Sequence, residues 1–472
     1  DMIFIAESVN GFIKSIISRS NDIKNVQAKI LDYNLDGDLD LICLNTESIK
    51  IFDNTLNNIN KFLNIKLTGL RVGSGKNNYF GIGSKIEIKS GDIYQTKIVK
   101  NSRTHFGLIQ NKDVDVMRVV WTNGYPQNVI NPDLNQEIIE KQELKGSCPY
   151  LYCWDGEKFD FVKDILWRNA LGMPLGIMSS GYMKYAFHHS TDEYVKIPGE
   201  YLKPKDQNYI LKISMELWET AYYDNIKLHV IDHPINSEIY VDEKFLPYKK
   251  LKKKIFTVKN KKYPITAYDG KGNDVLKYIL KRDFNFISNL ILSKYQGTTK
   301  KHDLIIDLGK IENPENIQLY LHGWLFPTDA SLNVKISQEK TFSIKSPTIE
   351  VLDQNNNWIT IDKNIFFPNG KDKTCIIDLS NKFLSNNYKI KISTSMAIYW
   401  DEVFFTENEE SIAKVETVLS SNSTILEYRG YSKKYLKSNI QGLDYPSFYE
   451  VFEYPKWRDL RGSYTKYGEV NS

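Results

Sequence analysis

The stretch of sequence that decides the fold reads DYNLDGDLDLICL and spans residues 32–44. In its first nine residues, side chains that carry oxygen alternate with others, and a glycine stands where the backbone must turn sharply. This spacing suits a hard cation that prefers oxygen ligands, so we predict a Ca²⁺ site. The expected ligands are the side chains of Asp32, Asn34, Asp36 and Asp40 and the backbone carbonyl of Asp38. The apolar run that follows predicts a strand.

An acidic turn without metal is the alternative interpretation of this loop, because Asp and Asn side chains also stabilise turns by bonding to nearby backbone. The four carboxylates of the loop repel one another unless a cation neutralises them, which favours the metal. An EF-hand is excluded, since it needs a glutamate at loop position twelve and flanking helices, whereas that position holds Cys43. The loop therefore belongs to a β-sheet.

The loop resembles the calcium loop of FG-GAP repeats, which are the blades of integrin-like β-propellers. A second copy of the pattern supports this resemblance, since residues 1–6 (DMIFIA) align with residues 40–45 (DLICLN) at an offset of 39 residues, about one blade. The resemblance implies an incomplete propeller, the C-terminal part of one, at residues 1–58. Fewer than two blades cannot close a propeller. We therefore expect the missing blades to belong to the same precursor or to another subunit.

Short alternating strands separated by Gly and Asn turns are predicted next, at residues 64–67, 81–88, 104–108 and 119–127. This segment resembles an ASPIC/UnbV domain, a small β module that follows FG-GAP repeats in cartilage-acidic-protein-like proteins and in many bacterial secreted proteins. We place this β domain at residues 59–145. The order of the two modules along the chain agrees with that of the family, so each resemblance supports the other.

The remaining residues predict further β-sandwich or jelly-roll domains, so the chain as a whole is expected to be mainly β, in line with its 13% aromatic content. The phrase IEVLDQNNNW at residues 349–358 resembles the strand and turn of discoidin or galactose-binding jelly rolls, which implies glycan or protein binding through loops. The expected parts are a connecting hairpin and glycine-rich loop at 146–203, a β domain with a basic hairpin at 204–300, a jelly roll at 301–406, and an aromatic and basic tail with helix-compatible segments at 407–472.

Composition bears on the class of partner. The 62 basic and 58 acidic residues nearly cancel, so we expect no nucleic-acid partner and no strong membrane-surface field. A lysine-rich run at residues 249–262 either binds an anionic polymer or solvates a hairpin. No apolar run has the length of a transmembrane segment, and four cysteines are too few for a disulfide scaffold. Cys148 and Cys153 either close a small loop or stay unpaired.

No catalytic residue and no organic cofactor are predicted, because the chain contains no nucleophile-elbow, phosphate-loop or zincin motif. The adjacent pair His188 and His189, with Asp192 and Glu193 close by, is the best candidate for a second metal or acid–base site. Neighbouring residues of a strand point to opposite faces, which weakens that candidate.

Two functional hypotheses follow. The first is a calcium-stabilised secreted, cell-surface or periplasmic protein that contacts a protein or glycan partner as a binding or scaffold module. The second is an enzyme, or a non-catalytic subunit of an extracellular or periplasmic enzyme complex, with a site around His188, His189 and Asp192. Replacing those three residues separates the two, since an enzyme would lose activity and keep its stability.

Overall fold

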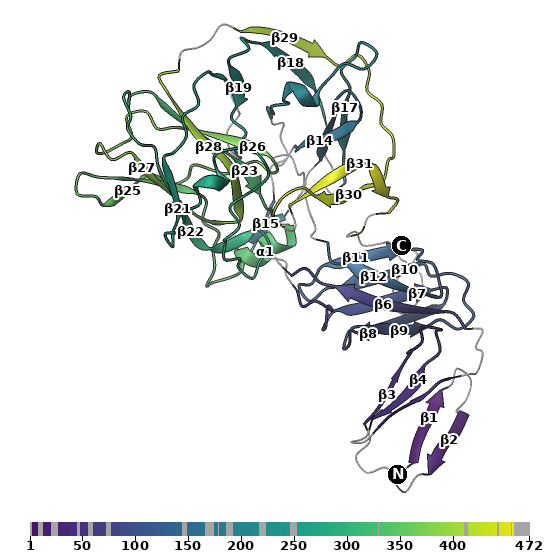
Figure 1. Cartoon of the computed structure of the whole chain (residues 1–472). Helices are drawn as coiled ribbons and strands as arrows, with labels where there is room; N and C mark the ends of the chain where they lie inside the picture. The colour runs from purple at the N-terminus through teal and green to yellow at the C-terminus, as the bar shows by residue number, and fades with distance from the viewer. Residues whose placement is uncertain are drawn as a thin grey trace. The chain divides into compact units, whose positions relative to one another are not determined.

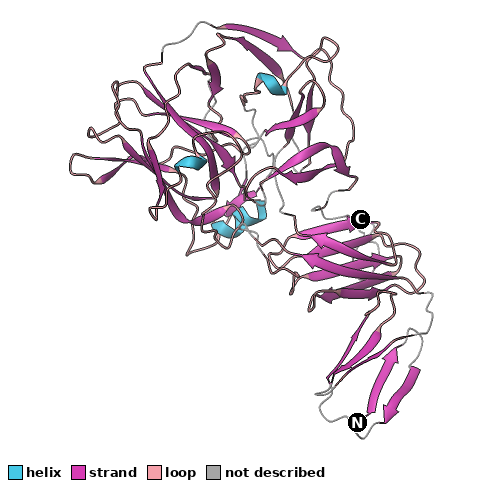
Figure 2. Ribbon diagram, in the orientation of Figure 1, coloured by secondary structure: helices cyan, strands magenta, loops and turns pink. Residues whose placement is uncertain are grey.

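The computed structural model of the chain shows a mainly β protein, which confirms the predicted fold class (Figure 2). Its helices in the described residues are α1 (Ala330–Ser337) and the short 3₁₀ helices η1 (Gly199–Tyr201) and η2 (Leu276–Tyr278). The structure describes residues 2–7, 13–19, 27–44, 48–54, 60–71, 77–143, 149–165, 174–177, 179–185, 192–216, 223–245, 253–328, 330–409, 414–440, 443–454 and 456.

The chain divides into two compact units. The first unit comprises Asp1–Gly69, Asn77–Gln142 and Lys456–Ser472, and the second comprises Leu70–Lys76 and Glu143–Pro455. No helix of the described residues has the length and apolar character needed to cross a membrane.

The first unit begins with two small antiparallel sheets (Figure 1). The first pairs β1 (Met2–Glu7) with β2 (Ile13–Arg19), and the second has the order β3 (Gln27–Leu31), β4 (Asp40–Leu44) and β5 (Ile49–Phe52). Leu41 and Cys43 are buried on one face of β4, whereas the side chains of β5 are exposed. No sheet closes on itself in the described part of the chain, so the propeller at residues 1–58 stays a prediction.

Most of the first unit is a β-sandwich. One sheet has the strand order β11-β10-β7-β8 and the other β12-β6-β9, with β12 and β6 parallel and the other pairs antiparallel. Alternate residues such as Ile86 and Ile88 point into one core with Trp121, as the period of two in a strand requires. The strands are β6 (Phe62–Thr68), β7 (Lys85–Ser90), β8 (Ile93–Ile98), β9 (Thr104–Gly107), β10 (Val116–Val120), β11 (Pro126–Ile130) and β12 (Gln136–Lys141).

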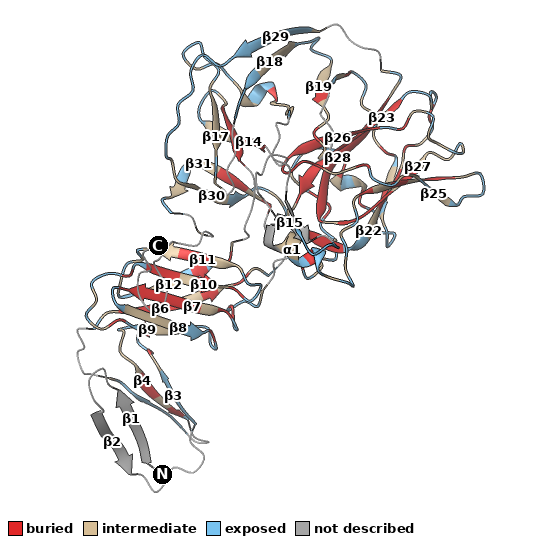
Figure 3. Cartoon of the chain, turned by 180° about the vertical axis from the view of Figure 1, so that it is seen from behind, coloured by how far each residue is buried: buried red, intermediate tan, exposed pale blue. Residues whose placement is uncertain are grey.

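A larger β-sandwich forms the centre of the second unit. Its five-stranded sheet has the order β21-β22-β27-β24-β25 and its three-stranded sheet the order β26-β23-β28, and Figure 3 shows the three-stranded sheet as almost wholly buried. The sandwich includes a strand from before residue 301, the start predicted for the jelly roll. The strands are β21 (Thr266–Asp269), β22 (Thr298–Asp307), β23 (Ile317–Leu325), β24 (Thr348–Leu352), β25 (Trp358–Asp362), β26 (Lys373–Asp378), β27 (Lys389–Met396) and β28 (Ile398–Glu407).

Smaller sheets complete the second unit. One has the order β14-β13-β17, and the pairs β15–β16, β18–β29, β19–β20 and β30–β31 form the others. An aromatic core joins them to the sandwich, because Tyr152 and Phe161 cluster with Trp324 and Tyr445. The strands are β13 (Tyr150–Trp154), β14 (Phe159–Asp164), β15 (Pro174–Ile177), β16 (Met183–Tyr185), β17 (Leu211–Ser214), β18 (Lys227–Asp232), β19 (Glu238–Val241), β20 (Ile255–Val258), β29 (Val415–Ser420), β30 (Tyr431–Leu436) and β31 (Asp444–Phe452).

The tail of the chain differs from the prediction of helix-compatible segments. Its described residues after 407 form three strands, β29, β30 and β31. The physical reason is aromatic packing, since Tyr445 is buried and Phe448 contacts the ring of Tyr152. Paired strands place such rings on the second unit, which the local sequence alone does not reveal.

The basic hairpin is charge-paired where it is described. Lys253 pairs with Glu416, and Lys262 pairs with Glu407 at 3.2 Å. Lys261 lies within ion-pair distance of two further glutamates. These contacts support the interpretation of the run as a solvated hairpin surface, while residues 246–252 lie outside the described residues.

Candidate functional site

The acidic loop of the first unit connects β3 to β4. Leu35 and Gly37 both have positive φ values, 67° and 97°, which bend the backbone within the loop. A Cβ atom on Gly37 would lie 2.1 Å from the ring of Phe62, so only glycine fits there. Asp32 and Asp40, at the two ends of the loop, are 2% and 1% exposed.

The exposed part of the loop is held by side chains that bond to nearby groups. The backbone N–H of Asp36 donates to Asn34 Oδ1 at 3.1 Å, and that of Asp38 donates to Asp36 Oδ1 at 2.9 Å. Such bonds are those of the turn without metal that the sequence left open. Within the described residues, no three His, Cys, Asp or Glu side chains are grouped so as to hold a metal ion.

One buried atom at the loop nevertheless needs a partner. Asp32 Oδ2 accepts from the Gly37 N–H at 3.1 Å and from Asn64 Nδ2 at 2.6 Å, but Asp32 Oδ1 is buried without a hydrogen-bond partner. A buried carboxylate oxygen without a donor is costly, and a cation is a partner that removes this cost. The residues present therefore fit a calcium ion at Asp32.

Asp40 and Asp53 have different roles at the loop. Both oxygens of Asp40 are occupied, one by the Tyr33 N–H at 2.9 Å and one by the Asn54 N–H at 2.8 Å, so Asp40 closes the loop. Asp53 is a residue that the sequence analysis missed, and its Oδ1 accepts from Asn34 Nδ2 at 3.0 Å. Desolvation, Asp40 and Asp36 all raise the pKa of Asp53, because like charges crowd this site.

The second metal candidate of the sequence is not assembled in the described structure. His188 and His189 lie outside the described residues, and Asp192 is exposed. Glu193 instead faces a buried network, where its Oε1 accepts from Asn369 Nδ2 at 2.9 Å. Cys153 is a free, buried thiol, and Cys148 lies outside the described residues.

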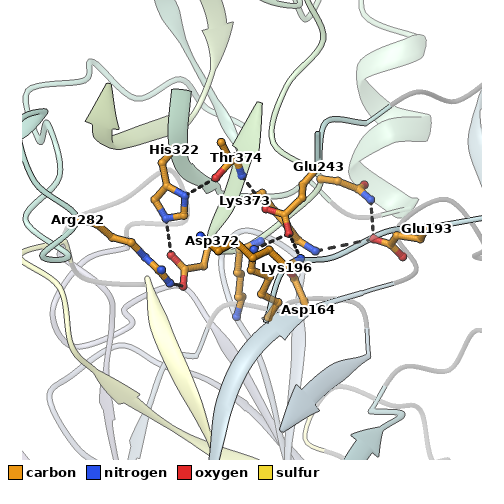
Figure 4. Close-up of polar contacts among 12 residues, drawn as sticks. Asp164, Glu193, Lys196, Glu243, Arg282, His322, Asp372, Lys373 and Thr374 are labelled. Carbon is orange, nitrogen blue, oxygen red and sulfur yellow. Dashed lines mark hydrogen bonds and ion pairs between the residues drawn. The ribbon is translucent and has the colours of Figure 1, made fainter. Parts of the chain in front are cut away.

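A buried ionic network is the second notable cluster, and it lies wholly within the second unit (Figure 4). Lys163 Nζ of β14 lies 2.5 Å from Glu243 Oε1, and both side chains are almost fully buried. Glu243 also accepts from the backbone N–H groups of Lys196 and Thr374, each at 2.9 Å. Burial lowers the pKa of Lys163 to about 8, and although burial opposes it, Lys163 lowers the pKa of Glu243. Both groups are thus charged at neutral pH.

The segment just before β26 carries this network to its neighbours. The Lys371 N–H donates to Asp164 Oδ1 at 2.7 Å, which ties the segment to β14. Lys373 is fully buried, and its Nζ lies 3.8 Å from Glu193 Oε1 (Figure 4). These contacts link the β13–β14 hairpin and residues around 193 to the central sandwich.

A histidine lies at the other end of the network. His322 Nε2 lies 2.8 Å from Asp372 Oδ1, and Arg282 donates to Asp372 Oδ2 at 2.6 Å (Figure 4). Burial alone would raise the pKa of Asp372, but Arg282 and His322 hold it far below its usual range. Desolvation lowers the pKa of His322, so its ring is neutral at pH 7.

Asp401 of β28 is a carboxyl group with the opposite shift. It is fully buried and accepts from the N–H groups of Asp283 and Phe284 at 3.3 and 3.1 Å. Desolvation raises its pKa to about 7, and the charge of Asp372 adds to this effect. Two carboxyl groups with pKa values moved apart are typical of acid–base chemistry, yet both are buried here, which also fits a structural role.

Comparison with known proteins identifies one part of the chain. Residues 73–145 match the ASPIC and UnbV family. The ASPIC/UnbV segment carries strands β7–β12 of the first sandwich, and the match confirms that part of the predicted resemblance. The FG-GAP interpretation of residues 1–58 stays a prediction.

The other comparisons add little. The search of curated proteins gave no match. A solved structure titled "Glycoside hydrolase" aligns with 85% of this chain and 74% of its own, at 9% identity and a TM-score of 0.16. A TM-score this low supports no argument about fold or activity.

Proposed function

We propose that this protein is a calcium-stabilised secreted or surface module that binds a protein or glycan partner or serves as a scaffold. The observation that carries the calcium part is Asp32 Oδ1, a buried carboxylate oxygen without a donor inside a loop of like charges. The localisation rests on the family resemblance, since exposed oxygen-ligand sites of modest affinity suit extracellular calcium concentrations.

The residues of the loop would divide the work of binding. Asp32, Asn34, Asp36 and the carbonyl of Asp38 would hold the ion, and Asp40 would keep the loop closed through its two backbone bonds. Bound calcium would supply the positive charge that these oxygens lack.

The same loop connects the small sheet to the sandwich. Asn64 of β6 donates to Asp32, and the ring of Phe62 of β6 lies against Gly37. An ordered loop therefore fixes the β3–β4–β5 sheet on the ASPIC/UnbV-containing sandwich within the first unit. We propose this as the structural role of calcium.

Thermal unfolding with and without a chelator tests the proposal. A ligand that binds only the native state stabilises it by mass action, so saturating calcium should raise the melting temperature of the first unit by roughly 5–10 °C. The Asp32→Asn variant should lose most of this shift, because it removes the charge and keeps the size of the side chain.

A matched control uses another turn of the same chemistry. Asp353 also accepts two backbone N–H groups, from Asn355 and Asn357, but it lies in a turn without further carboxylates. The Asp353→Asn variant should keep the full calcium shift. Equal melting temperatures of the parent protein with calcium and with chelator would refute the calcium part of the proposal.

An enzyme, or a subunit of an enzyme complex, is the second candidate function. The observation in its favour is the divergence of the pKa values of Asp372 and Asp401 within one cluster. If these groups act on a substrate, an opening to the cluster must form. Deuterium exchange at the Asp283 and Phe284 amides, which donate to Asp401, measures that opening. Protection equal to that of the sandwich core would contradict the enzymatic role.

A further inference from the structure

A cavity of about 150 Å³ opens into the central sandwich of the second unit. Its floor is apolar and includes Ile287, Leu304, Ile392 and Trp400, all members of the sandwich core. Protein cores are normally packed without voids of this size, because a void removes van der Waals contacts. A volume of 150 Å³ is enough for one six-membered ring.

The rim of the cavity offers hydrogen-bond acceptors. His302 Nδ1 lies 3.3 Å from the carbonyl oxygen of Lys300, to which it donates, and 3.0 Å from Thr299 Oγ1. Because burial lowers the pKa of His302, the ring is neutral and its Nε2 is a free acceptor among the described residues. Asp303 accepts from Ser393 Oγ at 2.5 Å through Oδ1, which leaves Oδ2 without a bond to any described residue.

The rim also offers hydrogen-bond donors. Lys271 and Lys301 line the cavity, are exposed, and make no hydrogen bond through Nζ with described residues. Asp269, by contrast, is fully engaged, because it accepts from the N–H groups of Lys271 and Asn273 and from the side chain of Asn289. Asp269 therefore shapes the turn that walls the cavity and leaves the binding to its neighbours.

We propose that this cavity binds a single polyhydroxylated six-membered ring, the size of one monosaccharide unit. A hydroxyl group both donates and accepts, so it matches a rim where Asp303 and His302 accept and lysines donate. The C–H face of such a ring matches the apolar floor, as in ligand pockets that combine an apolar wall with a few polar groups. This inference deepens the glycan-binding part of the proposed function and rests on it.

Saturation-transfer NMR with D-galactose, D-glucose and D-mannose tests the proposal on the whole chain. Ile291 lies at the rim and is 43% exposed, whereas Ile359 of β25 is 39% exposed and does not line the cavity. We expect at least one hexose to receive saturation at millimolar concentration. The Ile291→Trp variant should abolish that signal by narrowing the opening, and the Ile359→Trp variant should keep it.

Further arms separate the polar contacts and the alternatives. His302→Ala should weaken hexose binding at least fivefold while the melting temperature stays close to that of the parent. No signal from any hexose, or a signal that survives Ile291→Trp, overturns the proposal, as does stronger binding of glycine, a zwitterion without hydroxyls. All arms are run with calcium and with chelator, because the cavity and the acidic loop belong to different units. A calcium shift without hexose binding would reject this inference alone.

Discussion

The acidic loop of the first unit and the ionic network of the second unit both gather carboxylates, but they neutralise them in different ways. The loop places charges of one sign within nine consecutive residues, and most of them are exposed. The network combines both signs from residues as distant as Lys163 and Asp372, and all of its central groups are buried. A cluster of one sign requires an ion from outside, whereas a mixed cluster provides its own counterions. The loop therefore suggests a ligand, and the network suggests architecture.

The largest expected effect breaks the network. Glu243→Gln should lower the free energy of unfolding of the second unit by about 3–5 kcal/mol, because it leaves the buried Lys163 charge without a partner. Urea unfolding measures the change. The control is Glu450→Gln, which removes an exposed glutamate 3.9 Å from Lys433 and should change little. Equal effects of the two variants would show that the network does not stabilise the unit.

The next prediction concerns pH and Asp401. Its pKa is raised from 3.8 to about 7 in the folded protein, so the folded state binds the proton more tightly. Its contribution to stability is therefore fully present below pH 4 and is lost as the pH rises to 7, by at most about 4 kcal/mol.

Comparison with Asp401→Asn isolates this effect, because the other titrating groups are common to both proteins. Between pH 7 and pH 4, the stability of the parent should rise relative to that of the variant. A difference that does not change with pH would show that Asp401 titrates in its ordinary range.

A third prediction addresses the backbone of the acidic loop. Gly37→Ala should destabilise the first unit by about 2–3 kcal/mol, since it combines a positive φ of 97° with a clash against Phe62. Gly124→Ala is the control, because Gly124 has a φ of 89° and open space around its Cα. That variant should cost about 1 kcal/mol. Thermal unfolding that ranks the two variants equally would contradict the contact between the loop and β6.

The smallest expected effect changes sign with calcium. Asp53→Asn removes a charge that Asp40 and Asp36 repel, so the variant should be slightly more stable than the parent in chelator. In calcium the order should reverse, because the crowded carboxylates then face a cation. Melting temperatures in both buffers check this, and the same order in both would show that Asp53 does not sense the ion.

The loop could be predicted from sequence because its groups are consecutive, and the sequence also indicated the ASPIC/UnbV segment and the mainly β class. The additional group Asp53 was missed, since it reaches the loop only through the pairing of β4 with β5. The network was not predicted, because Lys163, Glu243 and His322 meet only when separate sheets pack together. The strands of the tail were missed for the same reason, since their aromatic partners are distant in the chain.

Calcium binding at the acidic loop is the central claim, and isothermal titration of calcium into chelator-treated protein tests it most directly. The account predicts a saturable site with about one ion per chain, lost in Asp32→Asn and kept in Asp353→Asn. Binding of equal strength and stoichiometry in the parent and in Asp32→Asn, or no binding at all by the parent, would contradict it.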